Sequence, residues 1–223
     1  MRALIAALFS VLLAGGAAAQ KTVSFPTEDG GVIYADVYGE GDRGIVLAHG
    51  GQFNKESWEK QARTLMSAGF VVLALDFRGY GKSRGPGQSK PLSAPLYLDV
   101  LAAVHYLKKT GAKSVSVIGA SMGAGAAGDA SVASRQGEID RLVFLGEAPY
   151  GAVEKLKAPS LFIVARDDSS ADGPRLPRIL AQYEKAPDPK KLIILDGSSH
   201  AQFLFQTDQG ERVMQELLHF LSN

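Results

Sequence analysis

Short apolar runs alternate with longer stretches of helical periodicity along this chain, and this alternation most restricts the folds open to it. Strands that are buried on both faces read as nearly continuous apolar runs and are typical of parallel sheets covered by helices. The pattern therefore predicts an α/β protein with a mostly parallel central sheet and helices on both faces. The expected buried strands are Gly44–Ala48, Phe70–Leu75, Ser114–Ile118, Arg141–Leu145, Ser160–Val164 and Lys191–Leu195.

The stretches between these runs mostly carry apolar residues at three- and four-residue spacing, which predicts covering helices. Val32–Val37 follows a turn at Asp29-Gly30-Gly31 and has the pattern of a half-exposed antiparallel strand, which suits the sheet edge. With 223 residues, of which 46% are hydrophobic, residues 20–223 are expected to form one domain around a well-buried core. The expected helices are Glu56–Ala68, Leu96–Thr110, Ala124–Ser134, Leu176–Lys185 and Asp208–Leu221.

The first nineteen residues have the organisation of a signal peptide. Arg2 supplies a basic start, Ala3–Leu13 an apolar run, and Ala17-Ala18-Ala19 a small-residue cleavage site before Gln20. An uncleaved membrane anchor is the alternative, but the run is shorter than the roughly 20 residues that cross a bilayer. We expect residues 1–19 to be removed, leaving a secreted or periplasmic protein without stable membrane insertion.

Charge and cysteine content exclude several classes of function. The 24 Lys and Arg residues nearly balance the 23 Asp and Glu residues, and no basic run indicates binding to nucleic acid. The absence of cysteine excludes disulfides, thiolate metal sites and a cysteine nucleophile. The expected partner is a small molecule.

The strongest chemical signal is Gly119-Ala120-Ser121-Met122-Gly123, which follows an apolar run and precedes a small-residue helix. This G-x-S-x-G pattern in a strand-turn-helix context predicts a nucleophilic serine on a strained turn. Glycines are required at 119 and 123 because a Cβ there would collide with the crossing backbone. A glycine-rich nucleotide-binding turn is the alternative, but neither G-x-G-x-x-G nor a Walker lysine is present.

A serine hydroxyl needs a base to remove its proton, and four histidines are available. His200 follows the expected strand Lys191–Leu195 and a short loop, at the carboxyl edge of the sheet, and is the best candidate for the base. His105 and His219 lie within expected helices, where a packed or solvated role is favoured. His49 ends a strand and is expected to shape the neighbouring loop rather than titrate.

The third member of such a site is a carboxylate that orients the imidazole. Asp167 and Asp168 both follow the expected strand Ser160–Val164. Asp168 is preferred because the run from Ala158 to Asp168 has the usual form of the segment that leads to the acid. Asp167 remains the alternative, and Asp172 is a distant third.

Acyl transfer also needs N–H donors aimed at the developing oxyanion. The N–H of Met122, directly after the serine, is one expected donor. The second is expected from the loop after Gly44–Ala48, where Gly51 is the first choice and Gln52 the second, because paired glycines let the backbone approach a substrate closely.

With these features, the chain resembles the α/β-hydrolase superfamily over Val32–Leu221. The segment between the strands Arg141–Leu145 and Ser160–Val164 is too short for a cap domain, so the chain looks like the small, capless members, such as dienelactone-hydrolase-like esterases. It differs from dienelactone hydrolase in having Ser121 where a cysteine would stand. The resemblance rests on His49-Gly50-Gly51 with Trp58, the run Asp76 to Ser83, the Ser121 turn, Asp168 and His200.

The resemblance implies a serine hydrolase that cleaves carboxylic esters of small or medium acyl groups through an acyl-enzyme, without metal or organic cofactor. An envelope peptidase, amidase or thioesterase with the same triad is an alternative, because the fold does not determine the substrate. A non-catalytic binding protein of the same fold is a further alternative. The segments Gly79–Pro95 and Ser169–Pro177 are expected to border the pocket.

Overall fold

The computed structural model describes residues 20–90 and 93–223. The predicted signal peptide, residues 1–19, lies outside the described residues. Among the described helices, none is both long enough and apolar enough to cross a membrane.

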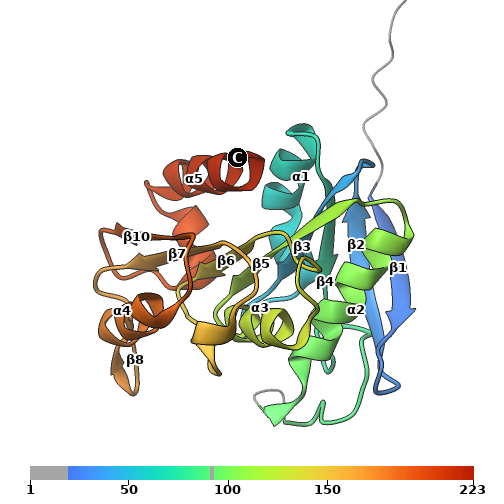
Figure 1. Ribbon diagram of the computed structural model, residues 1–223, viewed down its shortest axis with the longest axis horizontal. Coiled ribbons are helices and arrows are strands. Elements are labelled where there is room, and N and C mark those ends of the chain that lie inside the picture. Colours follow the sequence, from blue (N-terminus) through green and yellow to red (C-terminus); the bar gives the residue numbers. More distant parts are fainter. Residues whose placement is uncertain (1–19, 91–92) are drawn as a thin grey trace, which may run out of the picture.

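An eight-stranded sheet forms the centre of the molecule, in the order β1-β2-β4-β3-β5-β6-β7-β10 (Figure 1). The strands from β4 to β10 in that order pair in parallel, whereas β2 pairs antiparallel with both β1 and β4. This confirms the mostly parallel sheet. The strands are β1 (Lys21–Pro26), β2 (Val32–Tyr38), β3 (Arg43–Ala48), β4 (Val71–Leu75), β5 (Ser114–Ala120), β6 (Leu142–Leu145), β7 (Ser160–Ala165) and β10 (Lys190–Leu195).

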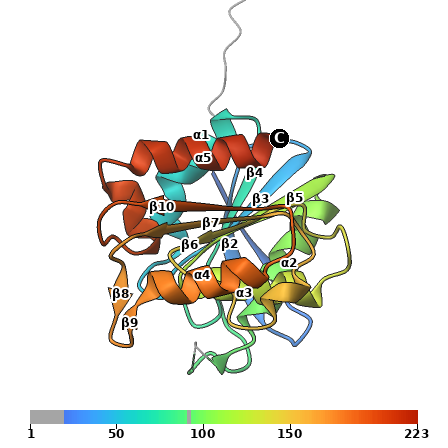
Figure 2. The same ribbon diagram turned by 60° about the vertical axis from the view of Figure 1, so that its left-hand side comes forward.

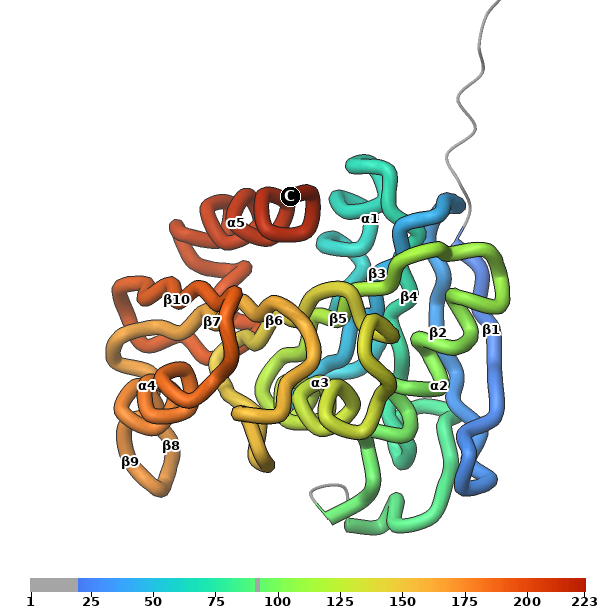
Figure 3. The backbone as a smooth tube through the Cα atoms, in the orientation of Figure 1, coloured from blue at the N-terminus to red at the C-terminus, as the bar shows by residue number. Residues whose placement is uncertain are grey.

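Helices cover both faces of this sheet, as predicted. The helices α1 and α5 lie side by side over one face although they are far apart in sequence (Figure 3), and α2, α3 and α4 lie over the other (Figure 2). Each face therefore has its own apolar core, because alternate residues of every strand point to opposite sides. The helices are α1 (Glu59–Ser67), α2 (Leu96–Lys109), α3 (Met122–Ala133), α4 (Arg175–Lys185) and α5 (Gly210–Ser222).

All five expected helices are present, with ends that differ by no more than three residues, and the starts of α1 and α3 are two examples. The helix expected over Glu56–Ala68 begins as the 3-10 turn η1 (Lys55–Trp58), where the Asn54 side chain accepts the Ser57 N–H. The helix expected from Ala124 begins at Met122, directly after the serine.

The segment between β6 and β7, residues 146–159, contains only the 3-10 turn η3 (Val153–Lys155), so no cap domain is inserted there. A small antiparallel hairpin, β8 (Ser169–Ser170) with β9 (Gly173–Pro174), follows β7 and was not predicted.

Candidate active site

The loops that leave β3, β5, β6, β7 and β10 meet at one edge of the sheet. These five strands run parallel and are neighbours, so their carboxyl ends lie together. In open α/β sheets this is the edge where ligands bind. Ser121 follows β5, Asp168 follows β7 and His200 follows β10.

Ser121 sits on a sharp turn between β5 and α3 in the left-handed region, with φ of 51° and ψ of −115°. A Cβ on Gly119 would lie 2.3 Å from the Gly123 carbonyl oxygen, and one on Gly123 would lie 2.2 Å from the Ala48 carbonyl oxygen. Both contacts are with backbone, which cannot yield. The two glycines therefore allow the turn that carries the serine, for the reason the sequence pattern suggested.

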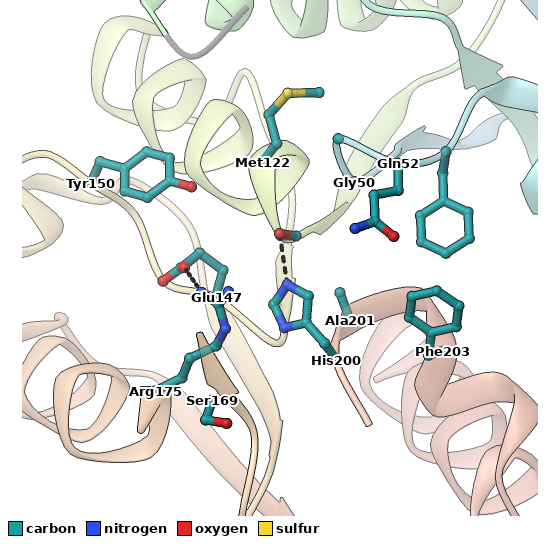
Figure 4. A pocket seen from close by; sticks show the side chains of 13 residues that line it. Gly50, Gln52, Met122, Glu147, Tyr150, Ser169, Arg175, His200, Ala201 and Phe203 are labelled. Atoms are coloured by element: carbon teal, nitrogen blue, oxygen red, sulfur yellow. Dashed lines mark hydrogen bonds and ion pairs between the residues drawn. The ribbon is translucent and has the colours of Figure 1, made fainter. Parts of the chain in front are cut away.

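A chain of hydrogen bonds joins the three predicted residues. His200 Nε2 lies 2.8 Å from Ser121 Oγ, and His200 Nδ1 lies 2.7 Å from Asp168 Oδ2. The dashed line from His200 in Figure 4 marks the first of these bonds. Asp168 is buried, whereas Asp167 is exposed and its N–H donates to the Gly197 carbonyl. Of the two candidates, Asp168 is thus the carboxylate that contacts the imidazole.

The other histidines lie elsewhere. His49 is buried; its Nδ1 lies 2.8 Å from the Gly50 carbonyl and its Nε2 accepts the Phe77 N–H. Burial lowers the pKa of His49 to about 4, so the ring is neutral and shapes its loop. His105 on α2 and His219 on α5 are exposed, and neither lines the cleft at Ser121.

The predicted oxyanion segment lies beside the serine. A Cβ on Gly50 would lie 3.4 Å from Ser121 Cβ, which is van der Waals contact, so the Gly50 backbone lies next to the serine. Gly51, Gln52 and Met122 all line the same cavity. The Gly51 N–H has no acceptor among the residues that the structure describes. Gly51 and Gln52 both remain available as the second donor.

The cavity around Ser121 has a volume of about 460 Å³ and two unlike walls. Tyr150, Glu147 and Arg175 lie on one side of His200, and Phe203 on the other (Figure 4). Phe203 packs against Phe53 with ring centroids 4.9 Å apart. One wall is thus polar and the other aromatic.

Buried charges organise the polar wall. The Glu147 carboxylate is 3% exposed and accepts hydrogen bonds from Arg175 Nη1 at 3.0 Å and from Arg178 Nη2 at 2.8 Å. Arg175 Nε also forms an ion pair with Asp168 Oδ1 at 3.3 Å. Sequence reasoning did not select these residues, because single charges in a loop and on a helix carry no recognisable spacing.

One expectation about the pocket border is wrong. Ser169 and Arg175 line the cavity, as expected for the segment Ser169–Pro177. In contrast, no described residue of Gly79–Pro95 lines it. Tyr80 of that loop does contact the site, since its hydroxyl donates to the Gly51 carbonyl at 2.9 Å. Within residues 20–90 and 93–223, no group of three or more His, Asp or Glu residues is arranged to hold a metal ion.

Comparison with known proteins agrees with this geometry. The model of the alpha/beta hydrolase family matches residues 45–147. The Pyrococcus furiosus esterase Pf2001 aligns over 92% of this chain and 90% of its own, with a TM-score of 0.75 and 22% identity. An esterase from Exiguobacterium antarcticum aligns over 91% of this chain and 100% of its own, with a TM-score of 0.73 and 16% identity. Residues 45–147 are thus similar to the alpha/beta hydrolase family, and the chain has the α/β-hydrolase fold.

Curated relatives match parts of this chain. A putative non-heme chloroperoxidase of Synechocystis is 39% identical over 94 residues, which are 42% of this chain and 32% of the relative. A non-heme haloperoxidase of Rhodococcus erythropolis is 29% identical over 121 residues, which are 54% of this chain and 42% of the relative. The matches thus cover less than half of these relatives' length. The dienelactone-hydrolase-like subtype stays a prediction.

Proposed function

We propose that this protein of α/β-hydrolase fold is a serine hydrolase that cleaves carboxylic esters of small or medium acyl groups. The observation that carries the proposal is the hydrogen-bonded chain from Ser121 Oγ through His200 to the buried carboxylate of Asp168. A binding protein without turnover has no need for a hydroxyl aligned at 2.8 Å with an imidazole that is itself oriented by a buried acid.

In the proposed mechanism, Ser121 Oγ attacks the ester carbonyl carbon while its proton passes to His200 Nε2. Asp168 accepts from Nδ1–H, which keeps Nε2 free to take the proton and stabilises the imidazolium. The tetrahedral intermediate collapses as the bond to the alkoxy oxygen breaks and His200 returns the proton to that oxygen. Water then attacks the acyl-enzyme with His200 again as base, releasing the acid and regenerating Ser121.

The carbonyl oxygen gains negative charge in both steps. The Met122 N–H stands at the N-terminus of α3, where it has no acceptor within the helix, and the proposed second donor is the Gly51 N–H. Such donors act on charge that develops in the transition state, and removing one costs about 3 kcal/mol of its stabilisation.

Support for a small or medium acyl group comes from the cavity of about 460 Å³ and from the short connection between β6 and β7. The esterases among similar structures favour an ester as substrate. A thioesterase, amidase or peptidase with the same triad is the competing proposal within hydrolases.

The first test is the intact mass of the purified protein after exposure to a fluorophosphonate probe. The parent is expected to gain one phosphonyl group at Ser121, whereas Ser121→Ala and His200→Ala variants gain none. A folded parent that stays unlabelled would overturn the proposal in favour of a binding protein.

The acid is tested by a matched pair of substitutions. Asp168→Asn keeps the shape of the side chain but favours the wrong imidazole tautomer, so kcat on an aryl ester should fall about 10⁴-fold. Asp167→Asn, one residue earlier and exposed, should leave kcat within about twofold of the parent. Equal losses in both variants would contradict the assignment of the acid.

Substrate class is then read from a panel of matched esters, thioesters, amides and peptides. The proposal predicts the highest kcat/KM for esters of short acyl chains. Because two relatives are named as haloperoxidases, the panel includes hydrogen peroxide with bromide. Preference for a thioester or peptide would replace the ester assignment while leaving the serine mechanism in place.

A further inference from the structure

The proposed oxyanion segment contains two successive glycines, Gly50 and Gly51, which have no side chains to hold them in place. Glycine has access to more backbone conformations than any other residue. An oxyanion donor stabilises a transition state only if it is already oriented when charge develops. The orientation of this segment must therefore come from groups outside it.

Part of the orientation comes from hydrogen bonds to carbonyl groups. The Gly50 carbonyl accepts from His49 Nδ1 at 2.8 Å and from the Phe53 N–H at 2.9 Å. Because a trans peptide is planar, its N–H points opposite to its C=O. Holding the Gly50 carbonyl thus also sets the direction of the Gly51 N–H in the same peptide. Tyr80 holds the next carbonyl, that of Gly51.

The remaining backbone group is the Gly50 N–H, and a side chain from the other end of the sequence accepts it. Gln202 Oε1 lies 2.8 Å from the Gly50 nitrogen, 152 residues away in the chain. Gln202 Nε2 donates to Ser57 Oγ at 2.8 Å. The Ser57 hydroxyl in turn donates to the Asn54 carbonyl, so both ends of the amide have defined partners. Gln202 is 4% exposed and does not line the cavity at Ser121.

The same turn orients the side chains of both Gln202 and His200. Ala201, between them, has φ of 52°, which is strained for a residue with a Cβ. Gly146 makes room for this turn, since a Cβ there would lie 2.6 Å from the Ala201 nitrogen and 3.0 Å from His200 Nδ1. His200, which caps the η4 turn (Ala201–Gln206), thus contacts the serine, and Gln202, two residues later, contacts the glycine segment.

We propose that Gln202 is a positioning residue that holds the Gly50-Gly51 backbone so that the Gly51 N–H is ready to receive the oxyanion. The inference rests on the proposed hydrolase function and names a further residue on which that function depends. Gln202 acts through Gly50 and touches neither the substrate nor the reacting atoms.

The test compares Gln202→Leu with three matched variants. Gln206→Leu makes the same replacement at an exposed position of the same turn. Ser57→Ala removes the partner of Nε2 but leaves the acceptor for the Gly50 N–H. Gln202→Glu keeps an oxygen that can accept from Gly50. Kinetics on an aryl ester and hydrogen exchange of a peptic fragment covering residues 49–53 are measured for each.

For Gln202→Leu, kcat should fall about 10- to 100-fold while KM stays within about twofold, because oxyanion donors act on the transition state. The pH midpoint of kcat/KM should not move, since the contact between His200 and Asp168 is untouched. Gln206→Leu and Ser57→Ala should stay within about threefold of the parent, and Gln202→Glu should recover most of the lost kcat. Exchange over 49–53 should be faster in Gln202→Leu alone.

Three kinetic results would overturn the positioning role. These are an unchanged kcat in Gln202→Leu, an equal loss in Gln206→Leu, or a shifted pH midpoint that reveals a displaced His200. Unchanged hydrogen exchange over 49–53 would also overturn it, whatever the activity. A parent without turnover is a failure of the proposed function instead, and is recognised before any variant is compared.

Discussion

At the scale of single residues, the buried imidazole of His49 makes folding depend on pH. Burial lowers its pKa from 6.5 to about 4. The unfolded chain therefore binds a proton on this residue between pH 6.5 and pH 4, whereas the folded chain does not. Stability should be unaffected by His49 above pH 6.5 and should decrease as pH falls, by about 3 kcal/mol near pH 4.

The free energy of unfolding in urea, measured at several pH values from 7 to 4, checks this expectation. A His49→Gln variant should be less stable at pH 7, because it loses contacts to Gly50 and Phe77, but should lose less stability on acidification. His219→Gln, on the exposed surface of α5, should follow the parent curve. The pKa of Asp29 is lowered to about 2, so protonation of this carboxylate reduces stability only at pH values below the measured range. Parallel curves for the parent and His49→Gln would contradict the prediction.

Single residues with a local signature were predictable from the sequence, and those defined by distant contacts were not. The serine was recognisable because its glycines are required by close backbone approaches within one turn. Asp167 and Asp168 differ by one position, and their different burial depends on how the turn after β7 packs. Gln202 had no signature, because its partner Gly50 lies 152 residues away.

At the scale of secondary-structure elements, a buried ionic cluster ties the loop after β4 to α2 and to the turn between β1 and β2. Arg78 and Asp99 are fully buried and share a hydrogen bond of 2.9 Å from Nε to Oδ1. Arg78 Nη2 also donates to Asp29 at 3.0 Å. Asp99→Asn removes one charge and leaves the guanidinium undercompensated, so unfolding free energy should fall by about 3 kcal/mol.

An exposed ion pair provides the control for this prediction. Arg63 and Glu59 pair at positions i and i+4 on α1, with both side chains about half exposed. Glu59→Gln should lower the unfolding free energy by no more than about 0.5 kcal/mol. Urea unfolding of both variants measures the two losses of unfolding free energy. A loss for Asp99→Asn as small as that for Glu59→Gln would show that other groups compensate the charge of Arg78.

The apolar pattern of the sequence predicted those helices and strands that are buried on one face or on both faces. All six expected buried strands are present, with ends that differ by no more than two residues. β1 was missed because its run Lys21–Pro26 offers only two alternating apolar residues, Val23 and Phe25, of which Phe25 alone is buried. The sheet edge is therefore formed by β1 and not by the expected strand Val32–Val37, which is second in the order. The turn η4 was also missed, since a 3-10 turn lacks the 3.6-residue period that identifies an α-helix.

At the scale of the whole molecule, the order of strands places the site. Parallel neighbours bring Ser121, Asp168 and His200 to one edge, although they are separated by up to 79 positions. The sequence predicted this meeting through the fold, because the alternation of strands and helices implies parallel pairing. It could not predict the polar and aromatic walls of the cleft, which depend on side chains from separate loops.

The proposed signal peptide makes a prediction about where the whole molecule is located. Cleavage after Ala19 would leave Gln20 as the first residue, directly before β1, so the sheet would lose no strand. Expressed from Met1 in a Gram-negative bacterium, the chain should appear in the periplasm with the mass of residues 20–223. Signal peptidase needs small residues at the first and third positions before the cut, so Ala19→Phe should block processing while Ala18→Phe should permit it. A full-length chain retained in the membrane fraction of the parent would favour the uncleaved anchor, with the folded domain tethered through the residue that precedes β1.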